Sequence, residues 1–426
     1  MSDIAVNKVI NAKGHPIEVT TVSGNFIYMQ PATTAGDAFG RLRVSDPFTL
    51  FDSSHRYYDN GLWSTSTGVS GAATFNSNQG LIDMTIGTTS GDNVFRETYK
   101  VFPYQPGKSL LAMNTFVMES GQENQRQRVG YFSSDNGIFI EQSGNTEPAI
   151  VKRSSVSGSV VDTRIEQSNW NVDSLNGSGE SGYTLDLTKA QIFWADLEWL
   201  GVGTVRAGFV IDGKFINCHS FHHANNIEST YITTASLPCR YEIENIDSVS
   251  TSGTLKQICS TVLSEGGYEL RGNANAIGTD INNEYTLTSS GSFYPVVSIR
   301  LQSDKTDAVV IPVGINILGA TNNSNYKWKL VKGGTTSGGS WTSAGSNSSV
   351  EYNLSGTSFS GGTVLNQGYT IGSNQGSVPI SIDRKNLFKF QLEREPFANT
   401  SYEFTVVIKS DSDSSEAYAS INWEEI

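Results

Sequence analysis

The stretch that decides the fold class runs from Ala190 to Cys218 and reads AQIFWADLEWLGVGTVRAGFVIDGKFINC. It holds three apolar runs of strand length, separated first by LGVG and then by DG. Both separators are turn sequences, because glycine adopts the positive φ angles that tight turns require. The pattern predicts a three-stranded antiparallel meander, with strands over 191–199, 204–211 and 214–218.

Similar short strands recur on the N-terminal side of this stretch. Arg128–Ser133 and Gly137–Gln142 flank an Asn-Gly pair at 136–137, which is a strong hairpin signal, and Ser109–Glu119 is a further strand-like run. Glycine makes up 42 of the 426 residues, whereas stretches rich in Ala, Leu, Glu and Lys, which would favour helices, are almost absent. We therefore predict an all-β protein with helix as a minor component.

Changes in composition divide the chain into four parts. Residues 1–46 are interrupted by Gly and Pro and read as an N-terminal arm. Residues 47–264 carry short strands at intervals of roughly 8–15 residues, which predicts a jelly-roll-like β-sandwich. The Gly- and Asn-rich passage 265–284 is the expected linker. We predict that 285–426 forms a second, displayed β-sandwich, with Phe388–Glu393 as one of its strands.

Net charge, the absence of long apolar runs and the spacing of the cysteines limit the classes of partner and the cellular compartment that we expect. A formal net charge of −13 argues against nucleic acid, because binding to phosphates depends on clustered Lys and Arg. No apolar run approaches the roughly 18–20 residues that span a bilayer, and the first residues do not form a signal peptide. The three cysteines, Cys218, Cys239 and Cys259, have no C-x-x-C spacing and suit reduced, buried thiols. We expect synthesis in a cytoplasm and no membrane insertion.

Two further patterns are candidate sites. In the arm, Arg41 and Arg43 alternate with Leu42 behind Phe39, which is typical of a half-buried strand that docks on a neighbouring protein. In the meander, alternation places Trp194, Asp196 and Glu198 on one face of a strand.

Those two carboxylates beside an indole form a possible glycan-contact face. Residues two apart on a strand are roughly 6.5 Å apart at Cα, which is compatible with the carboxylate spacing of glycoside hydrolases. Jelly-roll glucanases use a similar strand, but the further spaced Glu of their motif is missing. A solvated or salt-bridged outer face is the alternative, and we favour it over catalysis, with plain sugar binding between the two.

A metal site is the less favoured interpretation of the histidine-rich segment CHSFHH at 218–223. On a strand, His219 and His223 share a face with Phe221, whereas Cys218 and His222 share the other, so no three ligands converge. The sequence contains no nucleophile elbow, Walker loop or dinucleotide-binding glycine motif. We therefore expect no cofactor, no metal and no enzymatic activity.

Three sequence runs carry a family resemblance. The runs GDAFGRLRVSDPFTLFDS at 36–53, AQIFWADLEWLGVG at 190–203 and GFVIDGKF at 208–215 resemble a family of virion structural proteins of tailed bacteriophages, including those of marine bacteria. The resemblance covers about residues 30–250 and implies that the chain is part of a virus particle. It brings no catalytic residues with it.

The expected function is that of a non-enzymatic virion protein. We favour a fibre-like appendage of the tail or baseplate, and the alternative is a capsid decoration or head-fibre protein. A carbohydrate-binding or glycan-cleaving jelly-roll protein built on Asp196 and Glu198 is a third hypothesis. Expected partners are copies of itself, as a homotrimer, other virion proteins and a host surface glycan.

Overall fold

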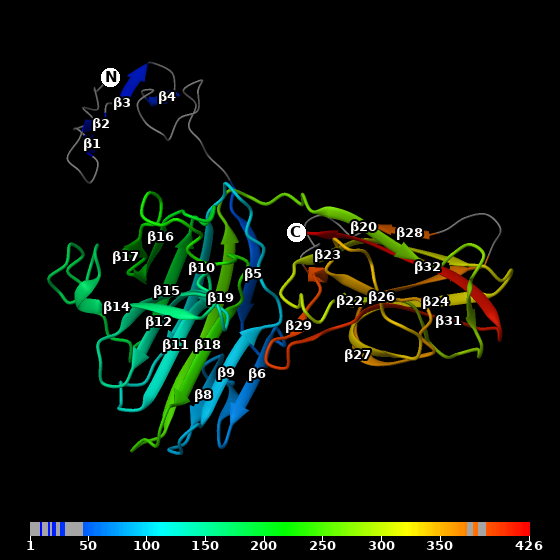
Figure 1. Cartoon of the computed structure of the whole chain (residues 1–426), viewed down its shortest axis with the longest axis horizontal. Helices are drawn as coiled ribbons and strands as arrows, with labels where there is room; N and C mark the ends of the chain where they lie inside the picture. Colours follow the sequence, from blue (N-terminus) through cyan, green and yellow to red (C-terminus); the bar gives the residue numbers. More distant parts are fainter. Residues whose placement is uncertain are drawn as a thin grey trace.

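The computed structural model of the chain describes residues 46–372 and 389–426, together with the backbone of five strands outside those ranges. Two β-sandwich domains lie side by side, and their strands pair in the antiparallel sense (Figure 1). Helical structure in the described residues is confined to short 3-10 turns such as Gln167–Asn169. The predicted all-β fold class is therefore confirmed. The five strands known by their backbone alone are β1 (Val9–Ile10), β2 (Pro16–Ile17), β3 (Val19–Val22), β4 (Phe26–Met29) and β28 (Val378–Ser381).

The larger sheet of the first domain contains the predicted meander, with β15, β16 and β17 as consecutive antiparallel neighbours. Asp212 and Gly213 in the second turn have φ angles of 50° and 73°, which is the tight-turn conformation that Asp-Gly favours. β5 and β8 both pair with β19, each along a different half. In spatial order the strands are β17 (Lys214–Phe221), β16 (Val205–Ile211), β15 (Gln191–Leu197), β10 (Leu110–Val117), β19 (Gly253–Ser264), then β5 (Phe48–Ser54) and β8 (Leu81–Ile86), and last β7 (Ala72–Asn76).

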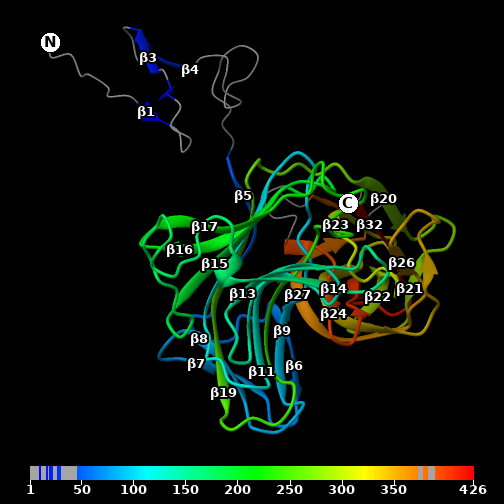
Figure 2. The same cartoon turned by 60° about the vertical axis from the view of Figure 1, so that its left-hand side comes forward.

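The second sheet of this domain has seven strands, and its β11–β12 pair is the hairpin predicted from Asn-Gly. The two sheets pack face to face, and the β15–β17 edge lies on the side away from the second domain (Figures 1 and 2). In spatial order the strands are β14 (Val161–Glu166), β13 (Ala149–Ser154), β12 (Gly137–Ser143), β11 (Gln125–Phe132), β18 (Cys239–Asn245), β9 (Asn93–Thr98) and β6 (Trp63–Gly68).

One apolar core lies between these two sheets. β5 contributes Phe51, whose ring centroid is 4.7 Å from that of Phe102 and 6.0 Å from that of Trp63. The sulfurs of Cys218 and Cys239 are buried in the same core, and burial raises the pKa of both thiols. This aromatic packing makes β5 an integral strand of the first domain, although it lies at the N-terminal end of that domain.

The second domain has its own separate core between a five-stranded and a six-stranded sheet. The five-stranded sheet comprises β20 (Asn273–Gly278), β32 (Ser415–Glu425), β23 (Val310–Gly319) and β28, with β21 (Tyr285–Leu287) also on β32. The other comprises β25 (Thr342–Ser343), β26 (Val350–Asn353), β22 (Tyr294–Leu301), β31 (Phe404–Ser410), β24 (Asn325–Ser337) and β27 (Ser358–Ile371).

The connection between the domains differs from the expected linker 265–284. Asn273–Gly278 pairs with β32 and so belongs to the second domain, which leaves 265–272 between the sheets. The sequence pattern does not reveal this strand, because NANAIG carries few large apolar side chains and its pairing partner is distant: Asn273 and Glu425 are 152 residues apart in the chain.

The segment before β31 does not form the strand predicted over Phe388–Glu393. Among its described residues, Gln391–Glu393 is irregular, and only Arg394–Glu395 pairs, as β29, with β30 (Thr400–Ser401). Its backbone and side chains bond to the first domain instead: Gln391 Nε2 donates to Val101 O at 2.8 Å, and the Arg394 amide donates to Tyr99 O. The apolar residues of its alternating pattern, Phe390 and Leu392, pack against the core of the second domain, whereas Gln391 faces the first domain. None of the helical turns in the described ranges is long and apolar enough to cross a membrane.

Candidate functional site

The three residues of the predicted glycan-contact face lie on and just after β15. Phe193, Ala195 and Leu197 point into the core, so Trp194 and Asp196 point to the outer face of the larger sheet, as the alternation indicates. Glu198 follows the last residue of β15 and is exposed to solvent. The sequence therefore predicts the direction of these side chains, and their chemistry depends on what each one contacts.

Asp196 is fully engaged in contacts with its neighbours. Its Oδ2 accepts a hydrogen bond of 2.8 Å from Nε of Arg206, the residue directly opposite on β16, and also contacts Nη2. The hydroxyl of Ser109 donates to Oδ1. A buried carboxylate whose two oxygens already accept hydrogen bonds from Arg206 and Ser109 is poorly suited to act as a nucleophile or a proton donor.

Trp194 and Glu198 do not complete a catalytic pair either. Trp194 is buried against the exposed ring of Phe215, with 5.7 Å between the ring centroids, so its indole offers little open surface to a sugar. Glu198 accepts a 3.3 Å hydrogen bond from the amide of Thr204. Its carboxylate lines a pocket of about 490 Å³ together with Asp196, Tyr104, Gly107, Lys108, Ser109, Leu200, Thr204 and Arg206.

The histidine-rich segment is part of an aromatic stack. The ring of His223 lies parallel to that of Tyr231, with 4.1 Å between centroids, and the ring of His219 meets that of Phe221 at 4.5 Å. Nδ1 of His223 lies 2.6 Å from Gly203 O. Burial lowers the pKa of His219 to about 4 and also lowers that of His223, so both rings are neutral at neutral pH.

In the segment 218–223, the side chain of one residue, Cys218, points to the opposite side of the strand from the one predicted. A β-bulge between Ala207 and Gly208 leaves Cys218 without a partner on β16, and its side chain is buried in the same core as Phe221. Within the described ranges, no three His, Cys, Asp or Glu side chains are grouped so that they could hold a metal ion.

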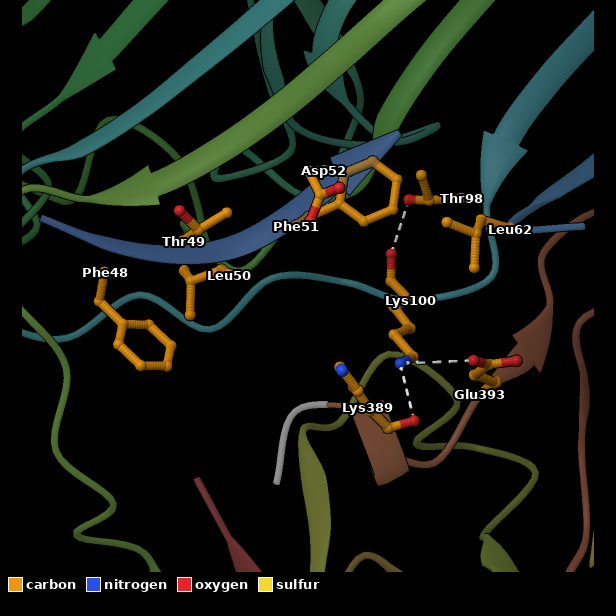
Figure 3. Close-up of a pocket in the computed structure, with 10 residues that line it drawn as sticks. All are labelled: Phe48, Thr49, Leu50, Phe51, Asp52, Leu62, Thr98, Lys100, Lys389 and Glu393. Carbon is orange, nitrogen blue, oxygen red and sulfur yellow. Dashed lines mark hydrogen bonds and ion pairs between the residues drawn. The ribbon is translucent and has the colours of Figure 1, made fainter. Parts of the chain in front are cut away.

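Sequence reasoning missed a pocket of about 340 Å³ between the domains (Figure 3). The strand β5 forms one wall, and Lys100, Lys389 and Glu393 form the other. The ammonium of Lys100 donates to Lys389 O at 3.2 Å and lies 3.6 Å from Oε1 of Glu393, whose Oε2 is 2.8 Å from Nζ of Lys332. Burial lowers the pKa of Lys100, although Glu393 partly opposes this shift. The lining is completed by Phe48, Thr49, Leu50, Phe51, Asp52, Leu62 and Thr98.

Sequence reasoning also missed a chain of ion pairs on the outer face of the seven-stranded sheet. In this arginine–glutamate ladder, guanidinium groups and carboxylates alternate, and each carboxylate binds two arginines, one through each oxygen. The N···O distances are between 2.6 and 3.1 Å, and the glutamate side chains are buried. The order is Arg394, Glu97, Arg240, Glu242, Arg128, Glu141 and Arg164.

Electrostatics favour the ionised form of Glu242, the central carboxylate of the ladder. Burial would raise the pKa of Glu242, but the guanidinium groups of Arg240 and Arg128 outweigh it and hold the pKa below its usual value. Arg240 also lies over the rings of Phe132 and Phe397, at 5.8 and 5.4 Å from their centroids. Because Phe397 and Arg394 belong to the second domain, the ladder joins the two domains.

The proposed arm residues Phe39, Arg41, Leu42 and Arg43 lie outside the described residues. The described part of the same motif begins at Asp46 and continues into β5. It therefore lies in the same sheet as the second motif, which forms β15 and the turn that follows it.

Comparison with known proteins finds similarity to solved structures alone. No family model and no curated protein matches the sequence. Solved structures match about half of the chain. The carbohydrate recognition domain of Emp47p is 10% identical, with a TM-score of 0.33, over 52% of this chain and 98% of that one. A β-1,3-glucanase from Mycobacterium marinum is 10% identical, with a TM-score of 0.34, over 50% of this chain and 98% of that one.

A protein of unknown function from Shewanella oneidensis is similar to the same degree. It is 11% identical, with a TM-score of 0.33, over 54% of this chain and 91% of that one. At these identities and TM-scores the likeness carries no argument about this chain. Its own sheets and cores define two β-sandwiches, and its function has to be argued from its own residues.

Proposed function

We propose that the chain is a non-enzymatic structural protein of a tailed bacteriophage particle, in a fibre-like appendage of the tail or baseplate. The observation that carries the non-enzymatic part is the contact of Asp196 with Arg206 and Ser109, which occupies both carboxylate oxygens of this member of the acid pair and leaves Glu198 alone. The particle itself is inferred from the resemblance of the motifs at 36–53 and 190–203 to virion proteins.

The contacts between the two domains support a role in which the protein transmits force. An appendage must transmit force between its attachment to the particle and its outer end, so a flexible linker alone would serve it poorly. Here the ladder and the contacts of Gln391 and Arg394 fix one sandwich against the other. In this proposal the segment 1–46 anchors the protein to another virion component, copies of the chain form a homotrimer, and the second domain faces outward.

Immunogold labelling of intact particles tests the proposal. The antibody is raised against residues 285–426, and particles that lack the gene provide the control. Label at the tail tip is the expected result. Label spread over the head would replace the appendage with a capsid decoration or head-fibre protein. Absence of label, together with absence of the chain from purified particles by mass spectrometry, would refute a virion role.

A glycan-cleaving enzyme is the second candidate function, and the pocket that contains both Asp196 and Glu198 favours it. The test is hydrolysis of β-glucans and of host surface polysaccharide by the purified protein and by the Glu198→Gln variant. We expect no turnover by either protein. Turnover that is lost in Glu198→Gln would make the protein an enzyme and Glu198 its catalytic residue.

A further inference from the structure

Two lysines face each other across neighbouring strands of the second domain. Lys327 on β24 and Lys409 on β31 are direct partners in the antiparallel register, and Lys329 follows on the same side of β24. Tyr326 and Trp328 point into the core, so the three lysines lie on the outer face of the sheet. Like charges directly opposite each other destabilise a sheet. No carboxylate in the described ranges lies within ion-pair distance of any of the three lysines, in a chain of net charge −13.

Two aromatic rings accompany these cations. Tyr369 on β27 is the partner of Lys327 on its other side, and its side chain is 75% exposed. The ammonium of Lys327 lies 5.2 Å from the centroid of that ring. The ammonium groups of Lys329 and Lys409 both lie over the ring of Phe293, at 4.3 Å and 5.2 Å from its centroid. Contact with ring faces positions the ammonium groups without neutralising their charge.

A pocket of about 510 Å³ opens beside this cluster, within the range of about 300–1,000 Å³ that small-ligand sites occupy. Lys327, Lys409 and Tyr369 line it, and so do Asn325 and Asp411. Asp411 accepts two hydrogen bonds from Asn325, of 2.9 Å from the backbone amide and 2.6 Å from the side chain. These bonds lower the pKa of Asp411, so it remains a carboxylate acceptor near the lysines.

We propose that this pocket binds an acidic saccharide, such as a uronic acid residue of a surface polysaccharide. The exposed face of Tyr369 suits the apolar face of a sugar ring. Lys327 and Lys409 together supply the cations that a sugar carboxylate needs, and Asp411 supplies an acceptor for ring hydroxyls. This composition favours a glycan over nucleic acid, because Tyr369 and Asp411 match a sugar ring and its hydroxyls, whereas the net charge of −13 of the chain disfavours a long phosphate backbone.

The location of the pocket fits exposure to a large polymer. β24 reaches the first domain near Lys332, which pairs with Glu393, whereas Lys327 lies five residues earlier, about 16 Å along the strand. A polysaccharide could therefore reach Tyr369 without meeting the first domain. Binding at this pocket depends on the chain alone, so it does not require that the protein be part of a virus particle.

Binding of alginate oligosaccharides, measured by calorimetry on the full chain, tests the proposal, with malto-oligosaccharides as the neutral comparison. We expect binding of alginate alone, weakened about tenfold or more by Tyr369→Ala and by the double change Lys327→Gln with Lys409→Gln. Tyr57→Ala is the matched control, since Tyr57 is 72% exposed and also lies against a cation, Arg56. Lys214→Gln, on the first domain, controls for net charge.

Thermal unfolding of the same variants separates binding from folding. The double lysine change should leave the melting temperature equal or higher, because it removes a repulsion. A fall in that temperature would mean that the lysines are structural, and equal affinity in the variants would refute the site. If duplex DNA binds and the same variants abolish that binding while alginate does not bind, the assignment to a saccharide is wrong.

Discussion

Glu97 of the first domain accepts a hydrogen bond of 2.7 Å from Nη2 of Arg394 in the second domain, and both side chains are buried. The other oxygen of the same carboxylate lies 2.6 Å from Arg240 on the adjacent strand. The contact between the domains is therefore the last step of an ionic ladder that crosses the sheet of the first domain. The stability of the folded chain should therefore depend on these ionic contacts.

Replacing Arg394 by Met should uncouple the domains. Glu97 keeps Arg240 but loses a charge-assisted hydrogen bond, so we expect a loss of about 2 kcal/mol in the free energy of unfolding. Calorimetry should resolve two separate transitions where the unchanged protein gives one. Arg271→Met is the control, because Arg271 forms an exposed pair with Glu269 and should change stability by less than about 0.5 kcal/mol. Equal effects of the two changes would contradict a structural role for the ladder.

Glu242→Gln should lower the free energy of unfolding more than the loss of Arg394, which lies at the end of the ladder. The change leaves Arg128 and Arg240 facing a neutral amide, and removal of one partner from a buried ionic network costs about 3 kcal/mol. Because the folded-state pKa of Glu242 lies below its usual value, its stabilising contribution is present above about pH 4.5 and is lost as the pH falls through the folded pKa.

Urea unfolding at several pH values measures both effects of Glu242→Gln. The variant should be destabilised most at neutral pH and should approach the unchanged protein in acid. Glu119→Gln, which alters an exposed carboxylate of the same domain, should have little effect. A variant whose deficit is the same at every pH would show that Glu242 acts through packing instead of charge.

His55 should make the protein sensitive to mild acid. Its ring is buried, neither nitrogen has a hydrogen-bond partner among the described residues, and burial lowers its pKa to about 4. The unfolded chain takes up a proton near pH 6.5 and the folded chain does so near pH 4. Stability should therefore fall between these values, by about 3 kcal/mol at most for this residue, and then level off. His55→Leu should flatten the profile of melting temperature against pH, and an unchanged slope would exclude His55 as its origin.

Deletion of residues 1–46 should leave a folded protein that no longer joins particles. The truncated chain retains β5, and Phe51 of that strand packs against Phe102 and Trp63 in the core. Circular dichroism and the melting temperature should match those of the full chain, while incorporation into particles is lost. A truncated protein that is unfolded would mean that the segment belongs to the first sandwich, and a truncated protein that still joins particles would refute the anchor.

The sequence predicts the strands well where one face of each is apolar. The meander, the β11–β12 hairpin and the outward direction of Trp194 and Asp196 follow from alternation and from turns such as Asp212-Gly213. The same rule fails for Asn273–Gly278, because a strand of small polar residues is recognised only when its distant partner, β32, is known.

The candidate sites are harder to predict because they depend on pairs distant in the sequence. Arg240, Glu242 and Glu244 alternate along β18 as a solvent-exposed face would, yet Arg128, more than 100 residues earlier, and Arg394 of the second domain bury most of that face. Likewise, Lys327 and Lys409 are unremarkable in the chain, and their register across β24 and β31 makes them a pair.

Cys259, on β19, is exposed, whereas the other two cysteines of the chain, Cys218 and Cys239, are buried in the core. A maleimide dye should therefore attach to one position per folded chain, slowly at first because partial burial raises the pKa of the Cys259 thiol. The protein thus carries a built-in counting label: the number of dye molecules bleached one by one on a single assembly of labelled chains would equal the number of chains in it.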